Sequence, residues 1–185
     1  MVDDVGIVGS PSTTTKITVD ILEDATGSPL HGQLVYLVHP LEQRCLIALG
    51  TVTEIITSNR WHEDPNMRGV LKRYGKLPHL SAVGDVRTAE VLVQAAYLSD
   101  SEDLSEGDAP IESGGSLSMS PTTGASVARV TDDFLTQLLR RHEDEIVYLG
   151  HIYQNEQVRL PLIVRDFGRA DEGYERRSKT VAPLG

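Results

Sequence analysis

Apolar and polar residues alternate strictly over several short stretches of the chain. In residues 15–22, Ile17, Val19 and Ile21 stand at every second position between polar residues. A period of two is the signature of a β-strand with one buried face. Similar apolar segments predict further strands at residues 5–9, 32–39, 44–58, 80–98, 145–153 and 158–167, with the polar segment 154–157 as the turn between the last two.

Glycine residues lie within and between these predicted strands. Gly50 lies inside the longest of them, where it indicates a bulge or a sharp bend. Short strands with glycine corners suit a closed barrel, because closure leaves no exposed sheet edge. The sequence therefore predicts a mainly β fold, a small closed β-barrel of about six to seven strands with two short helical insertions. We place this barrel domain at residues 1–168.

The first helical insertion is predicted at residues 65–75. Asp64 is a favourable N-cap residue, Pro65 suits the first helical position, and Gly75 suits the C-terminal end. The apolar residues between these ends recur at helical spacing: Met67, Val70, Leu71 and Tyr74.

The second helix is predicted at residues 131–142. The hydroxyl of Thr131 can cap its first turn, and Asp132 and Asp133 lie beside the positive end of the helix dipole. Its apolar stripe consists of Phe134, Leu135, Leu138 and Leu139.

Acidic residues are concentrated in one polar segment. The net charge of the chain is −10, and residues 99–114 hold six acidic and no basic side chains, which leaves −4 for the remainder. Residues 99–126 also contain almost no large apolar side chain, so we expect a mobile acidic loop there. The weakly acidic remainder argues against broad electrostatic capture of nucleic acid.

The cysteine content and the N-terminal sequence give an indication of the cellular compartment. Cys45 is the one cysteine and lies in an apolar run, so we expect a small buried side chain. The N-terminal segment Met1-Val2-Asp3-Asp4 carries two acidic residues where a signal peptide would be basic, and no apolar run is long enough to span a membrane. These features predict a cytoplasmic protein.

Several short motifs contain residue types that act in catalysis or metal binding. The candidates are His62-Glu63-Asp64, His142-Glu143-Asp144-Glu145, His151, and Ser113-Gly114-Gly115-Ser116. Each is better interpreted as a helix boundary, a charged turn, a strand residue or a flexible linker, since none has metal-site spacing or flanking catalytic elements. We therefore predict no catalytic, cofactor or metal residue in this chain.

The best basic patch lies on and just after the first predicted helix. It consists of Arg68, Lys72, Arg73 and Lys76, and Arg68 and Lys72 share a helix face. One interpretation is a solvated helix face. The other is a contact with DNA phosphates or with an acidic partner protein.

Four segments in order along the chain resemble the N-terminal barrel of HerA-type hexameric DNA-translocating ATPases. They are Val5-Gly6-Ile7-Val8-Gly9-Ser10, Gly32-Gln33-Leu34-Val35-Tyr36-Leu37-Val38, Leu49-Gly50-Thr51-Val52-Thr53-Glu54-Ile55, and Tyr148-Leu149-Gly150-His151-Ile152 with Val158-Arg159-Leu160-Pro161-Leu162. Each segment is weakly specific, and their shared order carries the resemblance, which extends over nearly the whole chain.

This resemblance implies a barrel, of the HAS-barrel type, fused to a RecA-like ATPase that forms a hexameric ring on DNA. In that family the barrels form a crown on which a nuclease or another effector docks, in DNA-end processing or in defence against phage. The chain lacks the family's Walker A sequence Gly-x-x-x-x-Gly-Lys-Ser/Thr, so ATP and Mg²⁺ would bind only in an absent ATPase core. Residues 169–185 would form the linker toward that core.

The resemblance therefore predicts a non-catalytic domain for assembly and docking. Its candidate partner surfaces are the apolar stripe of the first helix and residues 134–139, although either stripe would serve equally to pack on the barrel. Two alternatives are a stand-alone β-barrel that binds nucleic acid and a small hydrolase. Few aromatic residues and the negative charge weaken the former, and the absence of a recognisable nucleophile and base weakens the latter.

Overall fold

The computed structural model describes residues 4–75, 84–100, 111–153 and 155–164. Within them, seven strands form an antiparallel sheet in the order β2-β1-β7-β3-β4-β5-β6, and a further pairing of β2 with β5 closes the first six into a barrel. The prediction of a small, mainly β, closed barrel with short helical insertions is confirmed. The barrel strands are β1 (Asp4–Val8), β2 (Lys16–Ile21), β3 (Leu34–Pro40), β4 (Cys45–Asn59), β5 (Asp85–Ser99) and β7 (Ser126–Arg129).

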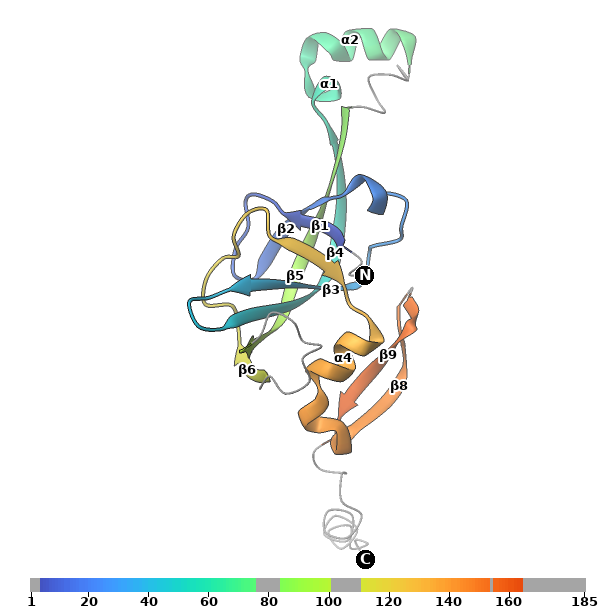
Figure 1. Cartoon of the computed structure of the whole chain (residues 1–185). Helices are drawn as coiled ribbons and strands as arrows, with labels where there is room; N and C mark the ends of the chain where they lie inside the picture. Colours follow the sequence, from blue (N-terminus) through green and yellow to red (C-terminus); the bar gives the residue numbers. More distant parts are fainter. Residues whose placement is uncertain (1–3, 76–83, 101–110, 154, 165–185) are drawn as a thin grey trace, which may run out of the picture.

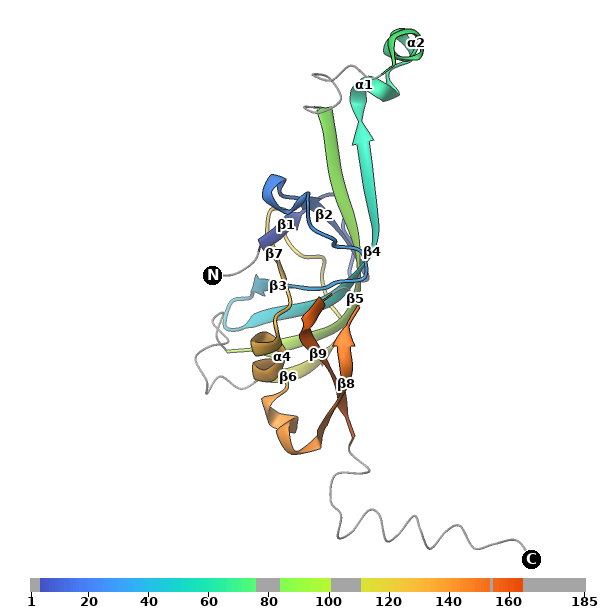
Figure 2. The same ribbon diagram turned by 90° about the vertical axis from the view of Figure 1, so that its right-hand side faces the viewer.

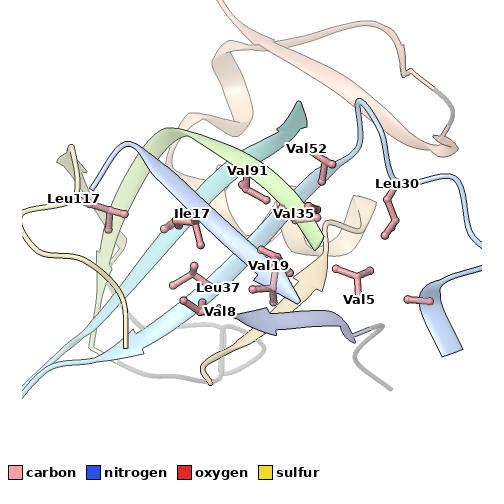
Figure 3. Close-up of a cluster of buried hydrophobic side chains, with 14 of the residues drawn as sticks. Val5, Val8, Ile17, Val19, Leu30, Val35, Leu37, Val52, Val91 and Leu117 are labelled. Carbon is pink, nitrogen blue, oxygen red and sulfur yellow. The ribbon is translucent and has the colours of Figure 1, made fainter. Parts of the chain in front are cut away.

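The barrel interior is filled by aliphatic side chains from alternate positions of its strands. Ile17 and Val19 of β2 are buried, as the period-two pattern predicts, and they meet Val35 of β3 and Val91 of β5. Figure 3 shows these side chains turned toward one another inside the barrel. Val, Ile and Leu can fill this interior without aromatic residues because their branched side chains fit the pleated surface.

The register of the sheet shifts at Gly50, where the sequence predicts a bulge or a bend, and the extra residue of this bulge is Gln94 of β5. The pairing of β4 with β5 shifts register between Leu49 and Gly50. A Cβ atom added to Gly50 would lie 2.6 Å from Val91 Cγ1 and 2.7 Å from the carbonyl oxygen of Leu92. The strands therefore approach each other more closely at this corner than any residue with a side chain would allow.

The distal halves of β4 and β5 leave the barrel as a two-stranded ribbon. The two-stranded part of this arm consists of residues 57–59 and 85–87, because residues 88–90 of β5 still pair with β2. The arm carries the short helices α1 (Arg60–Glu63) and α2 (Pro65–Tyr74) at its far end (Figures 1 and 2). The helix predicted at residues 65–75 is thus confirmed. Period-two alternation predicts strands here, but nothing in it indicates that they continue beyond the barrel.

A second layer covers the outer face of β3 and β4. It is built from α4 (Asp132–Leu138), the 3₁₀ helix η2 (Arg140–Glu145) and a separate two-stranded sheet of β8 (Ile146–Ile152) and β9 (Asn155–Ile163) (Figure 1). Its side chains form a second apolar cluster with Ile47 of β4. The helix predicted at residues 131–142 is therefore present as α4 followed by one distorted 3₁₀ segment.

The segment predicted as a mobile acidic loop, residues 99–126, differs from that expectation in part. Residues Ile111–Gly115 form β6, which pairs with β5, and Leu117 is buried in the barrel cluster. These residues show no alternating pattern, and their strand structure depends on the distant partner β5. Residues 101–110 lie outside the described residues, as do residues 165–185 with the predicted linker.

Candidate partner-binding surfaces

A hydrogen-bonded junction joins the arm to its helices. The side chain of Asn59 is buried, its Nδ2 donates to Asp85 Oδ1 at 2.7 Å, and its Oδ1 accepts from the backbone N–H of Trp61 at 3.0 Å. A Cβ atom at Gly84 would lie 2.9 Å from the indole of Trp61. The last residue pair of the ribbon is therefore fixed to the start of α1.

Helix α2 has the ends that the sequence predicts. Asp64 Oδ1 accepts from the N–H of Asn66 at 2.8 Å, Pro65 is the first helical residue, and Gly75 ends the helix at a φ of 68°. Positive φ is the conformation that glycine adopts readily. None of the α2 side chains is buried.

The apolar stripe of α2 does not pack on the barrel. The helix lies at the far end of the arm, away from the barrel (Figure 1). In the arm head, by which we mean the residues between Asn59 and Asp85, Met67 and Leu71 are half-buried, whereas Val70 is exposed and Tyr74 is 73% exposed. The first candidate surface predicted from the sequence is therefore accessible to a partner.

The residues of the predicted basic patch differ in their surroundings. Arg68 Nε donates to the carbonyl oxygen of His62 at 2.9 Å, so Arg68 fastens α2 to α1. Arg68 and Lys72 line an open hollow together with His62, Glu63 and Asp85. Arg73 is exposed, and Lys76 lies outside the described residues.

The second candidate surface, residues 134–139, is largely core rather than a free surface. Phe134, Leu135 and Leu138 are buried, and the Phe134 ring stacks on Tyr36 with the ring centroids 3.9 Å apart. Burial also raises the pKa of the Tyr36 hydroxyl. The alternative interpretation, that this stripe packs on the barrel, is therefore correct for α4.

The β8–β9 hairpin presents an apolar surface that the sequence reasoning missed. Within the described chain, Ile152 and Val158 at its turn end are buried in one cluster with α4, while most side chains toward its other end are exposed. The exposed large apolar side chains on these two strands are Val147, Tyr148, Leu149, Leu160, Leu162 and Ile163. The feature of the sequence that could have identified this surface is the composition of β8, which is apolar at nearly every position. Most of these apolar side chains are nevertheless exposed.

An ion pair anchors this hairpin to α4. Arg159 Nη2 donates to Asp132 Oδ2 at 2.6 Å, and the backbone N–H of Arg159 donates to Asp132 Oδ1 at 3.0 Å. These hydrogen bonds hold the pKa of the Asp132 carboxyl below its ordinary value. The guanidinium also lies 4.0 Å from the ring centroid of Tyr148, where a cation–π interaction is favourable.

The described residues that could act in catalysis or metal binding do not lie together in one site. His142 Nδ1 lies 3.0 Å from Glu145 Oε2 within η2, His151 is exposed on β8, and Cys45 is buried. Among the described residues, no three His, Cys, Asp or Glu side chains gather as they would around a metal ion. Of the Ser113–Ser116 motif, residues 113–115 form the end of β6.

The described residues define a closed antiparallel barrel with two projecting hairpins, the arm and β8–β9. Searches against protein-family models and against curated proteins find no match to this chain. None of the described helices is both long and apolar enough to cross a lipid bilayer.

Proposed function

We propose that this chain is a non-catalytic assembly and docking domain. The observation that carries the proposal is the β8–β9 hairpin, where Val147, Leu160 and Leu162 are exposed on one face and Tyr148 and Ile163 on the other. Exposed apolar side chains gathered on one element of a folded domain are typical of protein interaction sites. The exposed Val70 and Tyr74 on α2 add a second accessible apolar site at the far end of the arm.

The sequence resemblance extends this proposal to the N-terminal barrel of a HerA-like ATP-dependent DNA translocase. Three of the four resembling segments lie on β1, β3 and β4, and the fourth lies on the β8–β9 hairpin. A closed β-barrel is the fold that this resemblance implies. In this proposal the barrel belongs to a hexameric ring that moves DNA, and it presents a surface to a nuclease or another effector.

The experiment for the translocase assignment begins with the coding frame beyond Gly185. A Walker A loop encoded shortly afterwards would support the assignment, and an immediate stop codon or an unrelated domain would contradict it. In the longer protein, Leu149→Ser should leave ATP hydrolysis unchanged and weaken binding of the nuclease or effector encoded beside it. Isothermal titration calorimetry with the two purified proteins measures that binding.

A second candidate function is nucleic-acid binding by the barrel alone. The observation in its favour is α2, which contains Arg68, Lys72 and Arg73 and no acidic residue. Fluorescence anisotropy with labelled duplex and single-stranded DNA tests it. Sub-micromolar binding that weakens steeply with salt and with Lys72→Glu would favour this second function over a protein-docking role.

A further inference from the structure

The β8–β9 sheet has two edges, because β8 and β9 pair with each other and with no other strand of the described chain. Residues 147–151 of β8 are all exposed, whichever face of the sheet they lie on. A free strand edge presents backbone N–H and C=O groups with which another extended chain can pair. Each strand of this hairpin therefore has one edge that can accept a further strand, unless other residues cover it.

The hydrogen bonds between the two strands show which backbone groups of β8 point outward. The N–H of Val164 donates to the C=O of Glu145 at 2.8 Å, so these two residues form a hydrogen-bonded pair. Hydrogen-bonded and non-hydrogen-bonded pairs alternate in an antiparallel sheet. Ile146 and Tyr148 lie one and three positions after Glu145, so their N–H and C=O groups point away from β9.

The edge of β9 is covered within the described chain. The backbone N–H of Arg159 donates to Asp132 Oδ1 of α4 at 3.0 Å. Pro161 is paired with Tyr148, so its nitrogen also points outward, and proline has no N–H to offer. Both views show β9 on the side of the hairpin toward α4 and β8 on the side away from it (Figures 1 and 2). The open edge of this sheet is therefore that of β8.

β8 lacks the residue types that commonly protect an edge strand. Natural edges are blocked by charged side chains, by proline or by bulges, and β8 contains no Lys, Arg, Asp, Glu or Pro. It does contain a bulge, because the pairing with β9 shifts between Tyr148 and Gly150 and leaves Leu149 as the extra residue. A bulge bends and twists its strand. The edge is therefore open along residues 146–148.

The side chains beside this edge indicate what kind of segment fits it. Val147 lies on one face of the sheet with Leu162, and Ile146 and Tyr148 lie on the other face. An added strand has side chains on both faces, next to these residues, and apolar cross-strand neighbours stabilise such a pairing. A segment that fits is therefore extended, rich in β-branched or aromatic residues, and free of proline where it pairs.

The symmetry of the ring proposed above bears on the origin of that segment. Two identical β8 edges would pair about a two-fold axis, as in an isologous dimer. Neighbours in a cyclic ring are related by rotation about the ring axis, so their contacts join different surfaces. The β8 edge of each copy therefore stays open in such a ring, where a different protein can reach it.

We propose that β8 accepts an extended segment of a partner protein, which pairs with residues 146–148 and adds a strand to the β8–β9 sheet. This inference rests on the docking role proposed above and names the form in which the partner binds. In this mode of recognition the main-chain hydrogen bonds provide affinity, and the side chains on either face provide specificity.

Selection from a phage-displayed library of short random peptides on the purified chain tests the proposal. We expect selected peptides without proline in their central positions and with apolar or β-branched residues there. A synthetic copy of one selected peptide is then titrated by isothermal titration calorimetry against Tyr148→Pro and Tyr148→Ala. Both variants lack the ring, but only Tyr148→Pro also lacks the outward N–H, so it should bind about tenfold or more weakly than Tyr148→Ala.

A second measurement does not depend on how Tyr148→Pro folds. Copies of the selected peptide are N-methylated at one backbone position each and titrated against the wild-type chain. Alternate amides of an added strand face β8, so methylation should prevent binding at every second position and leave it nearly unchanged between them. Circular dichroism of the two Tyr148 variants reports whether the fold is kept.

Three results would overturn the proposal. One is a library that yields no binding peptide, and another is a peptide whose binding is indifferent to N-methylation at every position. The third is a wild-type chain that dimerises in sedimentation velocity and that Tyr148→Pro makes monomeric, because a second copy would then occupy the edge. None of these measurements uses the neighbouring effector or the coding frame beyond Gly185, so this inference and the translocase assignment can fail separately.

Discussion

Asp132 and Arg159 join the first turn of α4 to the middle of β9 through the side chain and the backbone of the arginine. The carboxylate accepts from Nη2 at 2.6 Å, from Nε at 3.1 Å and from the backbone N–H at 3.0 Å. Because β8 and β9 form a separate sheet, this link and the buried residues Ile152 and Val158 fix the hairpin to α4.

The first prediction concerns the pH dependence of this link. The pKa of Asp132 is lowered in the folded chain, so its stabilising contribution is complete above the ordinary carboxyl range and is lost as the pH falls through the lowered value. Asp132→Asn should therefore lower the thermal midpoint at pH 7, and the difference from wild type should vanish in acid. Both side chains are substantially exposed, so the shift should be small.

Hydrogen exchange distinguishes a loss of stability confined to the β8–β9 hairpin from a loss of stability throughout the domain. In Asp132→Asn the amides of β8 and β9 should exchange faster, while those of the barrel strands β3 and β4 should keep their rates. A difference in thermal midpoint that did not shrink as the pH fell below the ordinary carboxyl range would contradict the role given to the ion pair.

The second prediction contrasts the two helices that the sequence marked as candidate surfaces. Phe134→Ala removes a buried ring that stacks on Tyr36, and it should lower the free energy of unfolding by about 3 kcal/mol. Tyr74→Ala on α2 should change it by less than about 0.5 kcal/mol, because that side chain is mostly exposed. Urea denaturation measures both, and equal losses would show that α2 packs as closely as α4.

The third prediction concerns the closely paired corner at Gly50. Gly50→Ala would push its Cβ atom against the side chain of Val91 and the backbone of Leu92, and backbone has little room to move. We expect a loss of about 2 kcal/mol in the free energy of unfolding. Gly27→Ala is the matched control, since no heavy atom lies within 4 Å of its added Cβ. Comparable effects of the two substitutions would contradict the close approach at Gly50.

Local patterns in the sequence were sufficient for the elements that depend on neighbouring residues. The alternation at Ile17 and Val19 gives β2 and its buried face, and Asp64, Pro65 and Gly75 give both ends of α2. Gly50 likewise marks the position at which the pairing of β4 with β5 shifts register. The alternation in β2 and the ends of α2 depend on residues that are close together within one strand or one helical turn. The feature at Gly50 depends on the absence of a side chain at that position.

Features that depend on distant partners could not be predicted in the same way. Residues 111–115 form a strand only through β5, and β7 is four residues long between β1 and β3. The stripe of α2 and the stripe of α4 have the same helical spacing, yet only Phe134 and its neighbours are buried. Helical periodicity identifies an apolar face, whereas the tertiary structure decides whether the barrel or a partner covers it.

The fourth prediction concerns removal of the arm head. Asn59 and Asp85 are opposite partners at the end of the ribbon, so an Asn-Gly turn can replace residues 60–84 and keep the register. Because α1 and α2 bury no side chain, the barrel should lose less than about 1 kcal/mol of stability in urea denaturation. A barrel that no longer unfolds cooperatively without residues 60–84 would show that the arm head belongs to the folding unit.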